Sequence, residues 1–333
     1  MLVAYRNRDT VALKEVEGIQ PQENQVRIRI DACGICGTDI HDDESMPHKF
    51  GHEIAGTISA LGPGVTNLHL GQQVVLDSAT PCGHCAMCKN GKQELCTDIQ
   101  SFYYLDQFGF AEEMVAPAIS VIPYDDMDAS VATLQEPLGV AIDLCRLSDI
   151  TTTSNVLVIG QGPIGLMASA LVRMKGARRV YVSDFASKFA RKKVAESLSI
   201  DRFIDAEHEN LQDALQGQHI DRILVTAPPP VIASAIDIAA KGAVISYIGI
   251  GHGSAATLSF DANKFHFKKL QLRASFASPA MFGPLALSYL NEGRVPGEQL
   301  ISHRFPLSEI DTALSVATHD PSALKVVVGR NND

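Results

Sequence analysis

The sequence has 333 residues, of which 46% are hydrophobic and 20% are charged, and its formal net charge is -10. This length is sufficient for two domains that each bury a core. The acidic balance argues against a nucleic-acid-binding surface, and no apolar run is long enough to span a membrane. Because the N-terminal segment lacks the apolar region and cleavage pattern of a secretory signal, we expect a cytoplasmic protein.

The N-terminal part of the chain predicts short strands separated by turns. Residues 25–30 alternate polar and apolar side chains with a period of two, as a half-buried strand does, and residues 53–60 and 73–76 show similar patterns. Glycine and proline at 62–64 and glycine at 71 mark the turns between them. Many short strands with such punctuation favour a compact, β-barrel-like domain.

A candidate catalytic metal site follows the first of these strands. Residues 34–41 read Gly-Ile-Cys-Gly-Thr-Asp-Ile-His, and Gly51-His52-Glu53 comes shortly afterwards. A thiolate, an imidazole and a carboxylate in close succession are ligands of a catalytic zinc, which keeps one coordination position open. Taken singly, a cysteine is usually a core residue and a histidine a structural hydrogen-bonding residue. Two patterns further along the chain favour the metal.

The first of these patterns is a cluster of four of the seven cysteines, with the spacing C-x2-C-x2-C-x7-C. In a protein without a secretory signal, this density favours metal ligation by thiolates. Four thiolates complete the closed tetrahedral shell of a structural zinc, with an iron–sulfur cluster or two disulfides as the alternatives. We call residues 82–96 the cysteine lobe; its four candidate ligands are Cys82, Cys85, Cys88 and Cys96.

Residues 109–115 predict another strand, and residues 131–146 predict a helix. Pro137 interrupts the hydrogen bonding near the start of that helix, so Glu136 lies where the chain bends. On these residues alone, Glu136 is interpreted as a solvated surface carboxylate.

The second pattern is a dinucleotide-binding turn. The apolar run 156–159 predicts a strand buried on both faces, and the apolar segment 166–174 predicts a helix. Between them lies a G-x-G-x-x-G turn, which points backbone N–H groups and a helix N-terminus at a pyrophosphate. The residues that we expect at the pyrophosphate are Gly160, Gly162, Pro163, Ile164 and Gly165.

Asp184 ends the next predicted strand, residues 180–183. A carboxylate at this position accepts hydrogen bonds from both hydroxyls of an adenosine ribose and repels a 2′-phosphate, so we expect NAD as the cofactor. The alternative interpretation is that Asp184 caps the following helix.

Strands and helices alternate in the rest of this part of the chain. The predicted strands are 221–226, 242–248 and 270–275, and the predicted helices are 188–198, 210–215 and 231–240. This alternation is typical of a doubly wound parallel sheet. The chain then returns to its first domain through helices 284–290 and 308–318 and a strand at 324–328. We therefore expect one domain over residues 1–150 with the return segment 280–333, and a second over 151–279.

With these residues in view, the chain resembles the zinc-dependent medium-chain dehydrogenases over nearly its whole length, and most of all their polyol (sorbitol) and sugar-acid branch. The resemblance implies an α/β protein with a GroES-like, β-rich catalytic domain and a Rossmann domain for NAD. Besides the cysteine lobe, it is carried by residues 34–41, 51–53, 110–112, 136–138 and 160–165.

The resemblance also implies roles for the residues of the first motif. Cys36 and His52 are expected as ligands of the catalytic zinc, and Glu53 as a ligand or an immediate neighbour. Glu136 corresponds to a third or water-bridged carboxylate of that zinc, and Asp39 is expected to orient His52.

Two further roles concern the reaction itself. Thr38 is expected to take the proton of the substrate hydroxyl and to pass it to His41 and solvent. In such enzymes zinc lowers the pKa of the alcohol while the nicotinamide accepts the hydride. With a structural zinc in the cysteine lobe, we expect two Zn²⁺ ions and one NAD per chain.

Two segments differ from the family pattern. Residues 42–50 form a shorter connection than relatives carry, which predicts a wider mouth of the substrate pocket; the acidic run 42–44 can equally be a solvated segment. The rings of residues 102–104 and of Phe108 either line that pocket or pack inside the barrel.

The expected function is hydride transfer between NAD and a secondary alcohol such as a polyol, sugar acid or cyclitol-like compound. The alternatives are an L-threonine or simple secondary-alcohol dehydrogenase, and a relative without catalytic activity. We expect a small-molecule substrate, no nucleic-acid or membrane partner, and a homo-oligomer, either a dimer or a tetramer.

Overall fold

The computed structural model of the chain describes residues 1–8, 10–41 and 45–330. The chain forms two compact units, Met1–Gly139 together with Ala277–Asp333, and Val140–Phe276. We call them the barrel unit and the sheet unit. The first division lies within a helix, α4 (Gln135–Leu147). In the described part of the chain, no helix has both the length and the apolar character needed to cross a membrane.

The barrel unit is built on a seven-stranded sheet with the order β15-β16-β3-β5-β6-β8, in which β7 also pairs with β3. A three-stranded sheet has the order β2-β1-β4. Neighbouring strands run antiparallel except β15 and β16, which are parallel. The strands are β1 (Leu2–Arg6), β2 (Val11–Glu15), β3 (Gln25–Gly34), β4 (His48–Lys49), β5 (Glu53–Leu61), β6 (Gln73–Leu76), β7 (Glu113–Pro117), β8 (Val121–Pro123), β15 (Ile301–Pro306) and β16 (Lys325–Gly329).

The period-two pattern predicted for residues 25–30 is confirmed in β3. Val26, Ile28 and Ile30 are buried, and they pack in one core with Phe110 of a connecting segment and Leu314 of α12 (Ile310–His319). Because β16 pairs with the end of β3, the last strand of the chain lies beside the strand that leads into the first motif.

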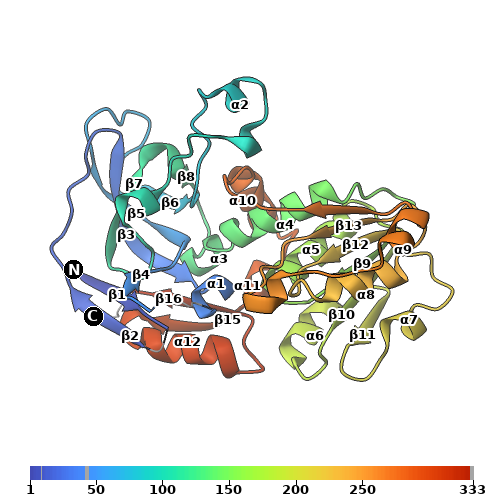
Figure 1. Cartoon of the computed structure of the whole chain (residues 1–333). Helices are drawn as coiled ribbons and strands as arrows, with labels where there is room; N and C mark the ends of the chain where they lie inside the picture. The colour runs from blue at the N-terminus through green and yellow to red at the C-terminus, as the bar shows by residue number, and fades with distance from the viewer. Residues whose placement is uncertain (9, 42–44, 331–333) are drawn as a thin grey trace. The chain divides into compact units, whose positions relative to one another are not determined.

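Short helices connect the strands of the barrel unit, and the cysteine lobe carries α2, which projects from the strands in Figure 1. These helices are α1 (Gly37–Ile40), α2 (Ala86–Lys89), α3 (Ala129–Ala132), α10 (Gly283–Asn291), α11 (Gly297–Leu300) and α12 (Ile310–His319), with 3-10 turns η1 (Gln93–Leu95), η2 (Phe102–Leu105), η3 (Ala118–Ser120) and η5 (Leu307–Glu309).

The single helix predicted over residues 131–146 is wrong. The segment forms two helices, α3 and α4, separated by Thr133 and Leu134. Pro137 is the third residue of α4, in the first turn, where a helix needs no backbone N–H from the proline. The break therefore places Glu136 in the first turn of α4.

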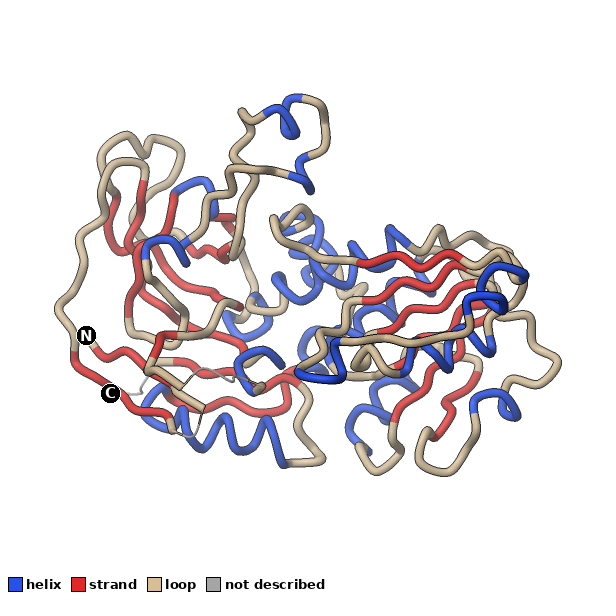
Figure 2. The backbone as a smooth tube through the Cα atoms, in the orientation of Figure 1, coloured by secondary structure: helices blue, strands red, loops and turns tan. Residues whose placement is uncertain are grey.

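The sheet unit contains six parallel strands with the order β11-β10-β9-β12-β13-β14. Counted along the chain this is 3-2-1-4-5-6, the order of dinucleotide-binding Rossmann domains, so the predicted doubly wound sheet is confirmed. Figure 2 shows the strands side by side among helices. The strands are β9 (Asn155–Ile159), β10 (Arg179–Asp184), β11 (Arg202–Asp205), β12 (Arg222–Val225), β13 (Val244–Tyr247) and β14 (Gln271–Ala274).

Helices cover both faces of this sheet. Leu157 and Ile159 of β9 pack with α8 residues such as Ile232. Val156 and Val158, which point to the opposite face, are also fully buried. The helices are α5 (Pro163–Met174), α6 (Phe189–Ser197), α7 (Leu211–Ala214), α8 (Val231–Ile238) and α9 (Ala262–Phe267), with a 3-10 turn η4 (Gly253–Ala256).

Candidate metal centres and cofactor site

Three neighbouring strands of the barrel unit bring the candidate catalytic residues together. Gly34, at the end of β3, is paired with Glu53 at the start of β5 and with Val327 in β16. Cys36 comes two residues after Gly34, and His52 immediately precedes β5. A thiol from one segment therefore meets an imidazole and a carboxylate from a second segment at one end of these strands.

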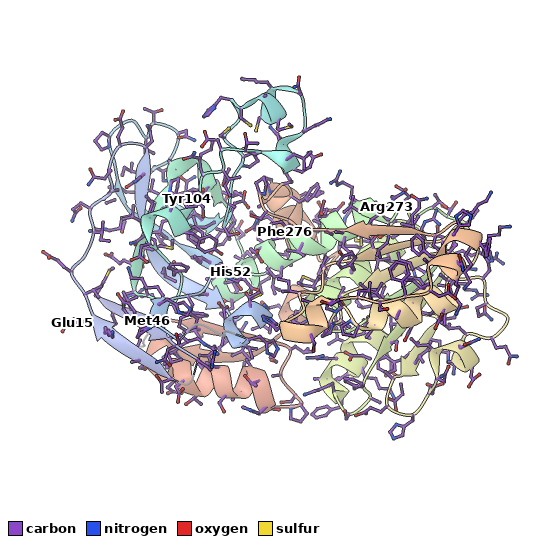
Figure 3. The ribbon with its side chains drawn as sticks, in the orientation of Figure 1. Glu15, Met46, His52, Tyr104, Arg273 and Phe276 are labelled. Carbon is purple, nitrogen blue, oxygen red and sulfur yellow. The ribbon has the colours of Figure 1, made fainter. Side chains whose placement is uncertain are left out.

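The ligand atoms of Cys36, His52 and Glu53 all lie within 4.8 Å of one another. Ligand atoms at about 2.0–2.3 Å from one tetrahedral zinc lie about 3.3–3.8 Å apart, so a group gathered within 4.8 Å is close to the dimensions of a metal site. The sulfur, nitrogen and oxygen donors are also those that zinc takes. The position of His52 among the strands of the barrel unit can be followed in Figure 3.

Two glycines make this convergence sterically feasible. A Cβ atom on Gly34 would lie 2.1 Å from the Glu53 Oε2 atom, so only glycine leaves room for that carboxylate. Gly51 has a φ of +94°, and a Cβ there would lie 2.6 Å from the ring of Phe110. Gly34 is therefore required by packing, and Gly51 is required both by packing and by its backbone conformation.

Lys325 is a member of this site that the sequence analysis missed. Its Nζ atom donates hydrogen bonds to Oε1 and Oε2 of Glu53 at 2.6 and 2.7 Å, and to the carbonyl of Ile35 at 2.9 Å. The side chains of Lys325 and Glu53 are only 4% and 1% exposed. Burial alone lowers the pKa of Lys325, but the charges of Glu53 and Cys36 raise it overall, so the amine of Lys325 stays protonated. The sequence feature that could have identified it is a lysine that directly precedes the apolar residues 326–328 of a predicted strand.

Asp39 lies beside His52, where the resemblance predicts an orienting residue. The Asp39 Oδ1 atom is 3.9 Å from Nδ1 of His52, an ion-pair distance, and its Oδ2 atom accepts a hydrogen bond from the Cys36 N–H at 2.8 Å. Burial lowers the pKa of His52, but a hydrogen bond with Cys36 and the charge of Asp39 outweigh burial and raise that pKa well above its ordinary value. The fixing of His52 by Asp39 stays a prediction.

The remaining predicted site residues lie at two helices, α1 and α4. Thr38 and His41 are exposed and three residues apart on α1 and at its C-terminal end, so they lie on one face of that turn. Glu136, in α4, is not part of the group of three ligands. Burial raises the pKa of Glu136 to about 7, while the charge of His52 opposes this shift, which places the two side chains within electrostatic reach.

Part of the aromatic segment packs inside the barrel, as one of the two alternatives predicted, whereas the lining of a substrate pocket stays a prediction. Phe102 is fully buried and belongs to the barrel core, whereas Tyr104 is 70% exposed. Between them, Tyr103 packs on Phe108 with ring centroids 5.3 Å apart. Burial, followed by the charges of Glu136 and Asp39, raises the pKa of Tyr103, so this residue lies near the candidate site. The acidic run 42–44 lies outside the described residues.

The four sulfur atoms of the cysteine lobe also lie within 4.8 Å of one another. The Cys96 Sγ atom is 3.6 Å from that of Cys82 and 3.8 Å from that of Cys85. A tetrahedral zinc with Zn–S distances of about 2.3 Å holds its sulfurs about 3.8 Å apart, so the lobe fits a zinc ion. All seven cysteines of the chain are free, which is inconsistent with the disulfide alternative.

Backbone groups of the lobe stabilise thiolates. The N–H groups of Cys82 and Asp98 donate to Sγ of Cys96, and that of Cys85 donates to Sγ of Cys82, at 3.3 to 3.4 Å. N–H groups of Cys88 and Thr97 lower the pKa of Cys85 to about 5, whereas burial raises that of Cys88 to about 12. Metal binding removes such a proton, because the thiolate is the ligand.

The glycine turn of the sheet unit lies between β9 and α5, as predicted. Gly160 has a φ of +93°, and a Cβ on Gly165 would lie 2.0 Å from the carbonyl oxygen of Gly160. Gly162 caps α5 and Pro163 occupies its first turn, so free N–H groups of a long helix lie at this turn. This arrangement suits a pyrophosphate.

Asp184 ends β10 next to this turn. It accepts hydrogen bonds from the N–H groups of Gln161 and Phe185, both at 2.9 Å, and Arg191 Nη1 lies 3.4 Å from its Oδ2 atom. The side chain of Gln161 is fully buried, where Nε2 donates to the Gly160 carbonyl and Oε1 accepts from Ser169. The sequence analysis did not identify Gln161, because the motif leaves its position free.

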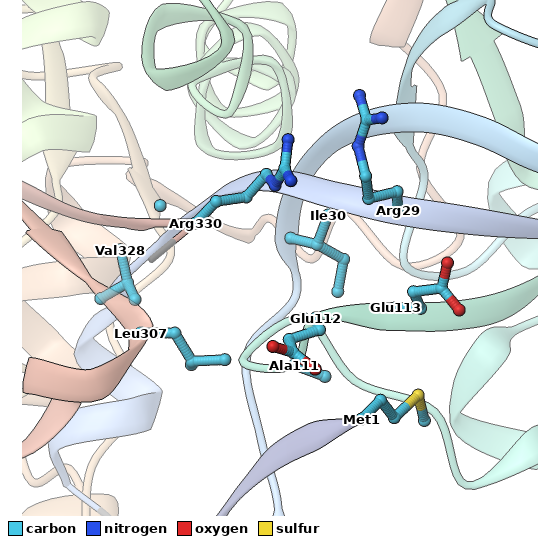
Figure 4. A pocket seen from close by; sticks show the side chains of 11 residues that line it. Met1, Arg29, Ile30, Ala111, Glu112, Glu113, Leu307, Val328 and Arg330 are labelled. Atoms are coloured by element: carbon cyan, nitrogen blue, oxygen red, sulfur yellow. The ribbon is translucent and has the colours of Figure 1, made fainter. Parts of the chain in front are cut away.

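A separate cavity of about 350 Å³ lies in the barrel unit and contains none of the candidate ligands (Figure 4). Two of its charged side chains are already engaged: Glu112 accepts a hydrogen bond from the Leu2 N–H at 2.8 Å, and Arg29 pairs with Asp31 at 3.2 Å. The candidate catalytic cluster of Cys36 is therefore separate from this cavity, and its assignment as the active site stays a prediction.

Comparison with known proteins agrees with this geometry. Residues 22–126 match the alcohol dehydrogenase GroES-like domain, and residues 163–288 match the zinc-binding dehydrogenase family. The L-galactonate-5-dehydrogenase of Escherichia coli K12 is 30% identical over 302 residues, which cover 87% of each chain. The L-threonine 3-dehydrogenase of Mesorhizobium japonicum is 28% identical over 343 residues, which cover 98% of this chain and 97% of that protein.

Among solved structures, the alcohol dehydrogenase rspB of Escherichia coli CFT073, complexed with its cofactor NADH, is 25% identical and superposes with a TM-score of 0.89 over 99% of both chains. Together with the two family matches, this confirms the expected fold, a GroES-like domain with a Rossmann-like parallel sheet. The chain therefore belongs to the zinc-binding medium-chain alcohol dehydrogenase family, zinc-dependent oxidoreductases that act on alcohols and polyols with NAD(P).

Proposed function

We propose that this chain oxidises a secondary alcohol group of a polyol, sugar acid or cyclitol-like compound, with NAD as the hydride acceptor. The observation that carries the proposal is the meeting of Cys36, His52 and Glu53 beside the exposed Thr38. The similarity to an L-galactonate-5-dehydrogenase supports a substrate with several hydroxyl groups.

Cys36 and His52 would hold the catalytic zinc, with Glu53 or Glu136 as the carboxylate of the site. Zinc supplies a Lewis acid that lowers the pKa of a hydroxyl group. Lys325 neutralises Glu53 and so keeps the net charge of the ligand set low. The four cysteines of the lobe would hold the second, structural zinc.

The proton of the substrate leaves through residues of α1. Thr38 would accept this proton on its hydroxyl oxygen while its own proton passes towards His41, which lies on the same face of the turn and reaches solvent. Asp39, near Nδ1 of His52, would hold the ring in one orientation and leave the other ring nitrogen for zinc.

The cofactor would bind at the sheet unit. N–H groups at residues 160–165 would hold the pyrophosphate, and Asp184 would accept the ribose hydroxyls. The charge of Asp184 favours NAD over NADP.

The second candidate substrate class is amino alcohols, because the chain is also similar to an L-threonine 3-dehydrogenase over 98% of its length. A panel of polyols, aldonates, cyclitols and amino alcohols, with NADH formation followed at 340 nm, separates the two. Turnover of L-threonine in preference to every polyol and sugar acid overturns the first assignment. A purified protein with neither zinc nor activity on the panel supports a non-catalytic role.

We also propose a homo-oligomer, a dimer or a tetramer, on the resemblance to the polyol dehydrogenase branch. Light scattering on the purified protein measures its mass against the 35.8 kDa of one chain. A monomer at micromolar concentration contradicts this proposal.

A further inference from the structure

We infer that Arg191 makes the adenosine site of this chain accept a 2′-phosphate, so that NADP serves as a second cofactor beside NAD. The inference deepens the proposed function and rests on the nucleotide role of Asp184. It is carried by the contacts of these two side chains and by the charge that they share.

The carboxylate of Asp184 has little acceptor capacity left while Arg191 is in place. Its Oδ2 atom accepts from the Gln161 N–H at 2.9 Å and from Arg191 Nη1 at 3.4 Å, and its Oδ1 atom accepts from the Phe185 N–H at 2.9 Å. Each carboxylate oxygen offers about two lone-pair sites, so one site remains. A ribose with two free hydroxyls must therefore displace Arg191 to bond with both through Asp184.

Arg191, in contrast, has donors to spare. Its side chain is 29% exposed, and its Nε atom is buried without a hydrogen-bond partner among the described residues. A guanidinium group offers five N–H donors in a planar fork that matches a phosphate. A 2′-phosphate on the ribose would engage these donors and leave the two bonds from the backbone to Asp184 unchanged.

The charge of Asp184 is offset locally by Arg191, although Glu207, which accepts hydrogen bonds from Ser187 in the same loop, adds a negative charge nearby. An isolated aspartate repels a 2′-phosphate, but the Asp184–Arg191 pair is neutral. Asp205 is paired in register with Asp184 on the neighbouring strand, and its Oδ2 atom lies 2.7 Å from Nδ1 of His208. Asp184 thus gives NAD its advantage, and Arg191 keeps that advantage small.

Two nucleotide fragments that differ only in the 2′-phosphate test the inference without substrate or turnover. The affinities of 5′-AMP and 2′,5′-ADP for the purified protein are measured by calorimetry. We expect the wild type to bind both within about tenfold. The variant Arg191→Gln should bind 2′,5′-ADP roughly ten- to hundredfold more weakly, as the loss of a charge-assisted hydrogen bond predicts, with 5′-AMP changed less than about threefold.

Two variants on the same helix sharpen the comparison. Lys192→Gln removes the same charge from a residue that lies 3.9 Å from Glu196 and does not contact Asp184, so its affinities should stay unchanged. Arg191→Lys keeps the charge but loses the fork and should give an intermediate affinity for 2′,5′-ADP. Asp184→Ser should shift the cofactor preference towards NADP, mostly through KM, and the added change Arg191→Gln should cancel that shift.

Each result has one meaning. A wild type that binds 5′-AMP but not 2′,5′-ADP, or an Arg191→Gln variant with an unchanged affinity ratio, overturns the inference and leaves the NAD assignment intact. A wild type that binds neither fragment overturns the nucleotide role of Asp184 and with it the proposed cofactor. Retained 5′-AMP binding in Arg191→Gln shows that the site is still folded.

Discussion

Lys325 and Glu53 form a charge pair that is almost sealed from solvent at the end of three strands. The side chains come from β16 and β5, far apart in the sequence, and are held at 2.6 Å. A pair of this kind contributes little net stability over apolar residues, but the removal of one partner leaves a buried charge without compensation. Because Glu53 is also a candidate zinc ligand, this pair connects the last strand of the barrel unit to the candidate metal site.

Substitution of Lys325 by methionine tests this link. We expect the free energy of unfolding to fall by about 3–5 kcal/mol, because Glu53 is then buried and unpaired. Urea unfolding followed by circular dichroism measures the loss. Lys325→Arg is the matched control, since it keeps the charge, and the double variant Lys325→Met with Glu53→Gln should recover part of the loss. An unchanged unfolding midpoint in Lys325→Met would count against the pair.

The raised pKa of Asp77 predicts that the stability of the folded chain depends on pH. Burial raises the pKa of this carboxyl to about 6, although it accepts a hydrogen bond from Gln135 at 2.9 Å. Because the folded state holds the proton more tightly than the unfolded state, whose pKa is near 3.9, stability falls as the pH rises from about 4 to about 6. The loss is about 3 kcal/mol above that range.

The variant Asp77→Asn keeps the hydrogen-bond acceptor and removes the charge. It should raise the stability at pH 7.5 by up to about 3 kcal/mol and leave it nearly unchanged at pH 4. Urea unfolding at both pH values measures the difference. Equal effects at the two pH values would show that the carboxyl of Asp77 does not titrate in this range.

The candidate ligands Cys36 and His52 have a catalytic and not a packing role in our proposal. Cys36→Ser and His52→Ala should abolish turnover, with one zinc lost and the lobe zinc retained. Far-ultraviolet circular dichroism should show the wild-type fold. If either variant, washed with a chelator, keeps full activity, the assignment of the catalytic zinc is wrong.

At the scale of elements, we expect the fold of the cysteine lobe to depend on bound metal. It contains only the four residues of α2 and a 3-10 turn, and most of its side chains outside the cysteines are exposed. Such a segment has no apolar core to fold around, so the free energy of metal binding is the free energy that orders it.

The variant Cys88→Ala leaves three thiolates in the lobe. We expect the loss of one zinc per chain and a lower Tm, while the second zinc stays bound. Metal analysis and thermal unfolding measure both effects. Cys145→Ala, which removes a buried cysteine of the sheet unit, is the control that should keep the full metal content. An unchanged metal content and Tm in Cys88→Ala would contradict a structural zinc.

At the scale of the whole molecule, the two units divide the chemistry. The barrel unit holds both candidate metal centres, and the sheet unit holds the glycine turn and Asp184. We expect two zinc ions per chain in the purified protein. All activity should be lost when a mild chelator removes the catalytic zinc. Nucleotide binding should survive that treatment, because its residues lie in the other unit. Calorimetry with NADH before and after chelation checks this separation.

The sequence determined those features that are set by local patterns. The alternation of residues 25–30, the apolar run at 156–159 with its glycine turn, and the spacing of the cysteines each specify a local structure, so they predicted β3, the first part of the Rossmann sheet and the lobe. The prediction of one helix over residues 131–146 failed because one long helix and two consecutive helices have the same hydrophobic periodicity. In the folded chain the helix is interrupted at Thr133 and Leu134.

The tertiary structure alone decided which distant side chains meet. Lys325 joins Glu53 because β16 pairs with β3, and Arg191 reaches Asp184 because α6, which follows β10 in the chain, packs back against β11 and α5. No spacing in the sequence encodes such contacts, since they depend on strand order and on how helices return over a sheet. For the same reason the buried acceptor bonds of Asp184, which decide how a ribose can be held, followed only from the folded turn at Gln161.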